Sequence, residues 1–354
     1  MITISKLTQK CLFLQPMSKE KLLGKTPEEL KEVVASVGLP AYTAKQLAEW
    51  MYVKKVKSLD EMTNISKEGR RKLSENYDLG IKLPSQLIES TDGTKKYLFE
   101  FDGGGVEAVM IPDDDRKTLC VSSQVGCKMG CKFCMTGRQG FHGNLSVAEI
   151  LSQFLSIDES LILTNTVFMG MGEPLDNYEN VSKAIDVLTA DWGFGWSPKR
   201  VTLSTIGLIP ALRLYLEQSR CHLAVSLHNP FPEERFQMMP VQKAYDIRDV
   251  VELIKHYDFY GQRRVSFEYT MFSGWNDDLR HAAGLARMLK GLECRVNLIR
   301  FHQIPDFPYV CSSPEKMAAF RDYLNAQGIT CTIRASRGED ILAACGMLAG
   351  KKNA

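Results

Sequence analysis

Three cysteines lie within eight residues of the sequence CKMGCKFC, at positions 127, 131 and 134. This stretch holds no histidine and no fourth cysteine, and no second paired knuckle of cysteines or histidines occurs elsewhere. Structural zinc sites take four ligands, usually as two such knuckles. A cubic iron–sulfur cluster takes one thiolate for each iron, so three cysteines would leave one iron open for an exchangeable ligand. The spacing C-x3-C-x2-C therefore favours an iron–sulfur cluster with an open iron over zinc.

The other cysteines do not have the distribution of a disulfide framework. The chain has ten cysteines in 354 residues. Cys120 lies close to the triplet, and the remaining ones are scattered, at positions 11, 221, 294, 311, 331 and 345. Local clustering in a long chain points to metal or redox chemistry in a reducing compartment. Because there is neither an apolar run of about 18 residues nor a signal-peptide pattern, we expect a cytoplasmic protein that does not enter the membrane.

The overall charge is nearly balanced, with a formal net charge of +2 at pH 7. That value excludes a strongly basic, histone-like binder of nucleic acid. Lysine and arginine still gather at residues 54–57, 67–71 and 128–138, where they allow local contacts with RNA. Most charge runs are simply solvated faces, so these clusters alone assign no function.

The first part of the chain predicts a small helical domain over residues 1–85. Thr26, Pro27 and Glu29 form a capping box with proline at the first helical position, and a basic helical stretch follows near 66–77. The segments SQLIES, KKYLFEF and VEAVMIP are separated by Asp-Gly and Gly-Gly turns, which predicts linking β-hairpins over 86–112.

Strands and helices alternate over the remaining residues, 113–354. The predicted strands are TLCVSS, TNTVFMGM, KRVTLSTIG, CHLAVSLH, RVSFEYTMF, RVNLIRF and TCTIRAS. This alternation predicts parallel strands joined by crossover helices, in an α/β partial (β/α)6 barrel rather than one of eight units. The unusual segments lie just beyond the strand ends: the cysteine loop, MGMGEP, STIG, SLHNP and RFHQIP. In β/α barrels that edge carries the active site.

Several of these segments resemble one known enzyme family. The cysteine motif, with Phe133 before its last cysteine, resembles the signature of radical S-adenosylmethionine (SAM) enzymes, and MGMGEPL is similar to their GGE-type motif. LCVSSQVGCKMGCKFCMTGRQGF, STIG, AVSLHNP and RGEDILAACGMLAG occur in order. From about residue 100 onward, the sequence thus resembles the RlmN/Cfr family of RNA adenine methyltransferases. The resemblance implies a radical SAM barrel, a 4Fe-4S cluster and SAM as cofactors.

The resemblance also implies which residues hold these cofactors. Cys127, Cys131 and Cys134 would ligate the cluster. The implied SAM contacts are Gly172, Glu173, Ser204, Ser226, Leu227 and His228. One position departs from the family pattern: many relatives have asparagine where this chain has His302, which can still donate one hydrogen bond.

The implied chemistry uses three further residues. Carbon 2 of adenine has no nucleophilic lone pair, so a radical route replaces simple attack on the SAM methyl group. Cys345 would accept a methyl group from one SAM, and a second SAM, cleaved at the cluster, would activate that methyl for addition to the base. Cys120 would release the product through a transient disulfide with Cys345. Glu107 fits the family's general base. Taken singly, Cys345 could be a buried small residue in a helix and Glu107 the solvent face of a strand.

The implied substrates are an adenosine of 23S rRNA and an adenosine of the tRNA anticodon loop, with the N-terminal helical domain as a source of RNA contacts. We expect a monomer that receives electrons from a low-potential donor such as flavodoxin. Two alternatives stay open. The antibiotic-resistance branch of the family methylates carbon 8 with the same cysteines. A non-catalytic iron–sulfur or zinc protein that binds RNA is the second alternative, although it has no use for the set Glu107, Cys120 and Cys345.

Overall fold

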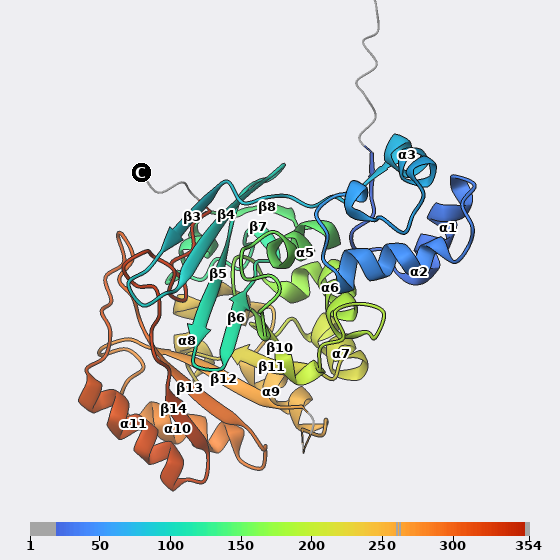
Figure 1. Ribbon diagram of the computed structural model, residues 1–354. Helices are drawn as coiled ribbons and strands as arrows, with labels where there is room; N and C mark the ends of the chain where they lie inside the picture. Colours follow the sequence, from blue (N-terminus) through green and yellow to red (C-terminus); the bar gives the residue numbers. More distant parts are fainter. Residues whose placement is uncertain (1–18, 260, 262, 351–354) are drawn as a thin grey trace, which may run out of the picture.

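The computed structural model describes residues 19–259, 261 and 263–350, and within them a ten-stranded sheet forms the body of the protein (Figure 1). Seven neighbouring strands are parallel: β6 (Arg116–Cys120), β9 (Asn165–Phe168), β10 (Val201–Thr205), β11 (His222–Ser226), β12 (Val265–Met271), β13 (Arg295–Arg300) and β14 (Thr330–Ile333). One longer helix follows each of the first six strands: α5 (Val147–Leu155), α6 (Tyr178–Thr189), α7 (Ile209–Gln218), α9 (Ile247–Lys255), α10 (Leu279–Leu289) and α11 (Pro314–Ala326), with the short helices α4 (Met135–Arg138) and α8 (Pro232–Met238) also lying between strands. These six β/α units, followed by β14, confirm the predicted partial (β/α)6 barrel.

The local sequence explains why these elements form. Helix α9 buries Ile247, Val250, Val251 and Ile254 at helical spacing against the sheet, while its polar residues face outward. Helix α5 begins at a capping box, in which the backbone N–H of Ser146 donates to the Glu149 carboxylate at 2.8 Å. The strands are short and mostly buried, as expected of parallel strands covered by helices.

The predicted hairpins are present and extend the barrel sheet at one edge. Strands β3 (Gln86–Glu89), β4 (Lys95–Phe101) and β5 (Gly104–Asp113) are antiparallel, and β5 pairs with the first barrel strand, β6. In this pairing Val109 lies opposite Cys120. Glu107, two residues earlier on β5, is therefore carried on the same continuous sheet as the barrel.

The N-terminal helices pack beside the barrel as a separate small body (Figure 1). Helix α1 (Pro27–Ser36) has the predicted capping box, and α2 (Thr43–Ala48) and α3 (Lys67–Asn76) follow it. Glu29 of α1 accepts a 2.6 Å hydrogen bond from Lys183 of α6, which links the two bodies. Residues 1–18, including Cys11, lie outside the described residues. Among the described helices, none has the length and hydrophobicity needed to span a membrane.

Candidate active site

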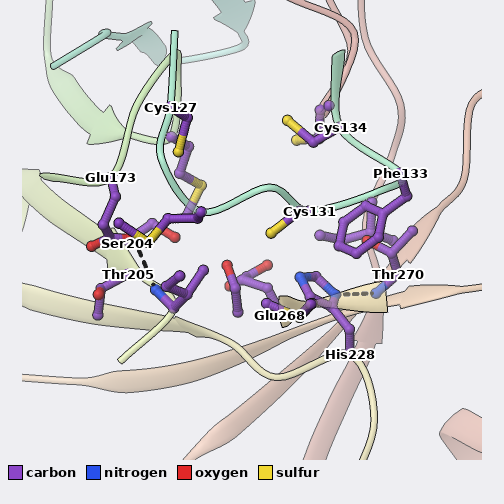
Figure 2. Close-up of a pocket in the computed structure, with 18 of the residues that line it drawn as sticks. Cys127, Cys131, Phe133, Cys134, Glu173, Ser204, Thr205, His228, Glu268 and Thr270 are labelled. Atoms are coloured by element: carbon purple, nitrogen blue, oxygen red, sulfur yellow. Dashed lines mark hydrogen bonds between the residues drawn. The ribbon is translucent and has the colours of Figure 1, made fainter. Parts of the chain in front are cut away.

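A cavity opens where the parallel strands end, with about 930 Å³ of empty space including its open mouth. Figure 2 shows the three clustered cysteines on one loop, facing Ser204 of β10, Glu268 of β12 and His228, which follows β11. The predicted site residues that line this cavity are Cys127, Cys131, Cys134, Gly172, Glu173, Ser204, Ser226, His228 and Cys345. Segments more than 200 residues apart in the sequence thus meet at the predicted edge of the barrel.

The cysteine loop is held by backbone hydrogen bonds on both sides. Cys127 directly follows β7 (Gln124–Gly126), and its N–H donates to the carbonyl of Gly140 at 2.8 Å. Cys134 directly precedes α4 (Met135–Arg138), and its N–H donates to the carbonyl of Cys131 at 3.2 Å. The three sulfur atoms therefore belong to one short loop whose ends are fixed.

The thiols are chemically suited to a metal cluster. Burial raises the pKa of Cys127 to about 12 and also raises the pKa of Cys131 and Cys134, so the free thiols stay protonated until a metal displaces the protons. No group of three His, Cys, Asp or Glu side chains within the described ranges converges on a point where one metal ion would fit. Ligands of a cubic cluster each bind a different iron and need no such common point. The donor set fits a 4Fe-4S cluster.

His228 is fixed as a neutral hydrogen-bond donor beside the loop. It has a left-handed backbone with φ of 56°, and its Nδ1 accepts a 2.9 Å hydrogen bond from the backbone N–H of Thr270. Burial, assisted by the Arg235 guanidinium, lowers the pKa of His228 to about 3. The single ring proton therefore resides on Nε2. The ring packs edge-on against Phe133, with ring centroids 5.0 Å apart.

Gly172 and Glu173 form a tight turn against the cysteine loop. Gly172 has a φ of 97°, and a side chain there would place its Cβ 2.5 Å from Cβ of Gln124. The Glu173 carboxylate accepts hydrogen bonds from the backbone N–H groups of Leu175 at 3.1 Å and Ile206 at 3.0 Å. Burial outweighs these contacts and raises the pKa of Glu173 to about 7. A positively charged group in the cavity would favour its ionised form.

Two charged residues that line the cavity, Glu268 and Arg334, were not identified from the sequence. Glu268 of β12 is almost fully buried, and its Oε1 accepts hydrogen bonds from Ser266 and Asn297, both at 2.8 Å. Its Oε2 has no hydrogen-bond partner, and the nearest cation is Arg334, at 3.8 Å. The sequence did offer a signal for Glu268: it is a carboxylate in the middle of the strand VSFEYTM, and both faces of a parallel strand are normally apolar.

Leu227 and His302 do not line the cavity. Leu227 is fully buried, and its carbonyl accepts a 2.9 Å hydrogen bond from Nε of Arg235. The Nε2 of His302 lies 3.1 Å from the hydroxyl of Ser336, in the segment that follows β14. The contacts of these two residues with SAM stay predictions.

Of the three remaining predicted residues only Cys345 lines the cavity, whereas Cys120 and Glu107 are not among its lining residues. Cys345 is exposed and lines the cavity, outside any helix, rather than being buried in one. Cys120 is buried at the end of β6, and burial together with the neighbouring Cys345 raises its pKa to about 12, against the opposing effect of Arg334. Glu107 is only 2% exposed, so it is not a solvent-facing strand residue.

Comparisons with known proteins agree with this arrangement. Residues 121–286 match the family model "Radical SAM superfamily", and residues 20–79 match "Ribosomal RNA large subunit methyltransferase N-terminal domain". A Parabacteroides distasonis protein named "Probable dual-specificity RNA methyltransferase RlmN" is 57% identical over 95% of this chain and 98% of its own. The chain belongs to the RlmN family of radical SAM RNA methyltransferases.

Two less similar proteins extend these comparisons. The "Dual-specificity RNA methyltransferase RlmN" of Syntrophus aciditrophicus is 40% identical over 95% of this chain and 98% of its own. The crystal structure of a radical SAM methyltransferase from Sphaerobacter thermophilus has 38% identity and a TM-score of 0.89, covering 94% of this chain and 99% of that one. The cofactors of this RlmN-family enzyme are a 4Fe-4S cluster and SAM.

Proposed function

We propose that this enzyme methylates carbon 2 of an adenosine in 23S rRNA and of an adenosine in the tRNA anticodon loop. The observation that carries the proposal is the exposed Cys345 in the cavity of the three clustered cysteines, with Cys120 buried next to it. The names of the similar proteins, which describe dual-specificity RNA methyltransferases, support two classes of RNA substrate.

We propose that Cys127, Cys131 and Cys134 hold the cluster and that the turn at Gly172–Glu173, with Ser204, Ser226 and His228, binds SAM. When bound, the two cofactors supply the methyl group and the radical chemistry that an electron-poor ring carbon requires. Glu173 would accept the SAM ammonium group, and His228 would donate from Nε2. Leu227 would contribute its backbone, as a fully buried residue between Ser226 and His228.

The three remaining residues divide the transfer to RNA among them. Cys345 carries the methyl group on its exposed sulfur. Glu107 accepts the proton that the base loses. Cys120 attacks the sulfur of Cys345, so that a transient disulfide forms as the bond from that sulfur to the transferred carbon breaks, and the carbon takes the electron pair and a proton to become the methyl group. The target base must leave its stack to reach a cavity at the barrel edge.

The proposal extends to the partners of the enzyme. The helical body of residues 20–79 contributes RNA contacts outside the cavity, because it matches the N-terminal domain of ribosomal RNA methyltransferases. A low-potential donor such as flavodoxin supplies electrons, and the enzyme acts as a monomer in the cytoplasm, where its RNA substrates are found.

The position of the methyl group distinguishes this proposal from its alternative, methylation of carbon 8. Nucleoside mass spectrometry of 23S rRNA and tRNA should compare cells with and without the gene. We expect 2-methyladenosine to disappear from both RNAs when the gene is deleted. Loss of 8-methyladenosine instead would replace the proposal with the alternative, and unchanged nucleosides in both RNAs would refute the assigned substrates.

SAM affinity is expected to depend on the ionisation of Glu173. The carboxyl group ionises as the pH rises through about 7, and only the ionised form can pair with the SAM ammonium group. Binding at pH 6 should therefore be roughly tenfold weaker than at pH 7.5. Titration of the reconstituted enzyme with SAM at the two pH values tests this. Glu173→Gln should bind weakly at both, whereas a wild-type affinity that does not change with pH would contradict the role.

His302→Ala is expected to weaken SAM binding by about 1–2 kcal/mol, the scale of one lost hydrogen bond. Because the ring also contacts Ser336 at 3.1 Å, Ser336→Ala is the matched control, which removes that contact but keeps the ring. Calorimetric titration should show weaker binding only for His302→Ala. Equal affinities of His302→Ala and wild type would mean that this position does not touch the cofactor.

A further inference from the structure

The segment that carries Cys345 is anchored on both sides of the cysteine. On its N-terminal side, the N–H of Gly338 donates to the Asp92 carboxylate at 3.0 Å, and Asp340 accepts from the N–H of Thr91 at 3.1 Å. Both partners lie in the turn between β3 and β4. On its C-terminal side, the carbonyl of Gly346 accepts from the N–H of Met135 at 2.8 Å. The exposed cysteine is thus held in place through its flanking residues.

Glu107 makes the most C-terminal of these contacts. Its Oε2 accepts hydrogen bonds from the backbone N–H groups of Ala349, at 2.7 Å, and Gly350, at 2.9 Å. Its Oε1 pairs with Nζ of Lys96 on β4, at 3.1 Å. The side chains of Glu107 and Lys96 are only 3% and 4% exposed. Both oxygens of the carboxylate are therefore committed, one to a buried ammonium and the other to the segment that follows Cys345.

The backbone of the segment that follows Cys345 packs closely against the backbone of β5. A Cβ on Gly105 would lie 2.0 Å from the carbonyl oxygen of Gly350, so the segment rests directly on the backbone of β5. Gln139 adds a 2.6 Å hydrogen bond to the carbonyl of Ala349. Two N–H groups that share one carboxylate oxygen make charge-assisted hydrogen bonds, which are stronger than neutral ones.

We infer that Glu107, oriented by Lys96, is a positioning residue that fixes Cys345 in the cavity by anchoring Ala349 and Gly350. This role is separate from its proposed role as the base and rests on the proposed function only in taking Cys345 as the methyl carrier. It assigns to Lys96 a function that its place in the sequence does not suggest: the buried ammonium keeps the carboxylate turned toward the segment.

Two matched double variants separate anchoring from proton transfer. Changing Glu107 or Lys96 alone would leave a buried charge without its partner, which destabilises the fold for an unrelated reason. Glu107→Gln with Lys96→Met is a neutral pair whose amide oxygen can still accept from Ala349 and Gly350. Glu107→Met with Lys96→Met has a similar volume but no acceptor. Glu89→Gln, at an exposed carboxylate of β3, is the control for altered sheet charge.

Hydrogen exchange of the full-length protein without cofactors is the primary measurement. Peptides covering 343–350 should exchange roughly tenfold faster in the Glu107→Met pair than in the Glu107→Gln pair. Peptides from β9 to β13 should exchange equally and serve as the folding reference. Equal exchange of the C-terminal peptides in the two pairs would overturn the inference.

A second variant tests the same contact without altering the carboxylate. Ala349→Pro removes one of the two N–H donors, and Ala349→Ser retains it. We expect faster exchange of the segment only in Ala349→Pro. Unaltered exchange in Ala349→Pro would overturn the anchoring role even if the double variants failed to fold.

Peptide mass spectrometry of the reconstituted enzyme with SAM then separates this inference from the proposed function. The double variant Glu107→Gln/Lys96→Met should still become methylated at Cys345, but it should form no RNA product, because the glutamine amide cannot accept the proton that the base loses. The Glu107→Met pair should methylate Cys345 at least several-fold less. Absence of methylated Cys345 in the wild type would refute the proposed function, whereas the exchange difference decides the anchor independently.

Discussion

The Cys120→Ala variant is expected to accumulate as a covalent adduct with RNA. Cys345 stays exposed in the cavity, so it can still be methylated, activated and joined to the base. Only release fails, because within residues 19–350 no thiol outside the triplet other than Cys120 is placed to displace the sulfur of Cys345. Cys120 lies at the end of β6, close enough to Cys345 for that thiol to help raise the pKa of Cys120, and among the described residues no other cysteine outside the triplet has its pKa raised by Cys345.

Denaturing gel electrophoresis after expression, with and without ribonuclease, measures the adduct. Cys120→Ala should migrate as a slower, ribonuclease-sensitive species, and the double variant Cys120→Ala/Cys345→Ala should not. Cys221→Ala removes another buried cysteine and is the matched control, for which we expect no adduct. If Cys120→Ala shows no ribonuclease-sensitive species while it retains its cluster, Cys120 is a structural strand residue.

The sequence was sufficient to predict the residues that act through local geometry. The capping box at Thr26 needs only three or four neighbouring residues, and it forms as predicted. The turn at Gly172 also depends on local backbone shape, since its φ of 97° favours glycine. Parallel strands place their C-terminal ends on one edge, so motifs that follow successive strands meet without further information.

The surroundings of Glu107 and Arg334 could not be predicted in this way. The alternation of side chains on β5 would put Glu107 toward solvent. Instead, the backbone of Ala349 and Gly350, more than 240 positions later in the sequence, covers it. Arg334 reaches Met169, 165 residues earlier, and its pKa is raised chiefly by Cys345. Such contacts depend on how the last segment folds back over the sheet, which no local pattern encodes.

Replacing Cys127, Cys131 or Cys134 with alanine is expected to abolish cluster binding altogether. In the proposed site each thiolate would bind a separate iron, so the loss of one leaves an iron without its protein ligand. Cys345 is the nearest alternative thiol in the cavity, but its segment is tied to α4 and to Glu107. Protein reconstituted without oxygen should contain about four irons and four sulfides per chain, and each variant close to none.

Iron and labile sulfide analysis, with the absorption of the reconstituted protein, measures this loss. Cys294→Ala, at a partly exposed cysteine remote from the loop, should keep the full cluster content and is the matched control. The apo variants should retain the wild-type far-ultraviolet dichroism, because the loop is held by backbone hydrogen bonds of Cys127 and Cys134 rather than by their sulfur atoms. A full cluster in any of the three variants would mean that the missing thiol is not a ligand. One zinc and no sulfide in wild-type protein purified without oxygen would refute the radical mechanism, since the same three thiols would then hold a metal that supplies no electron.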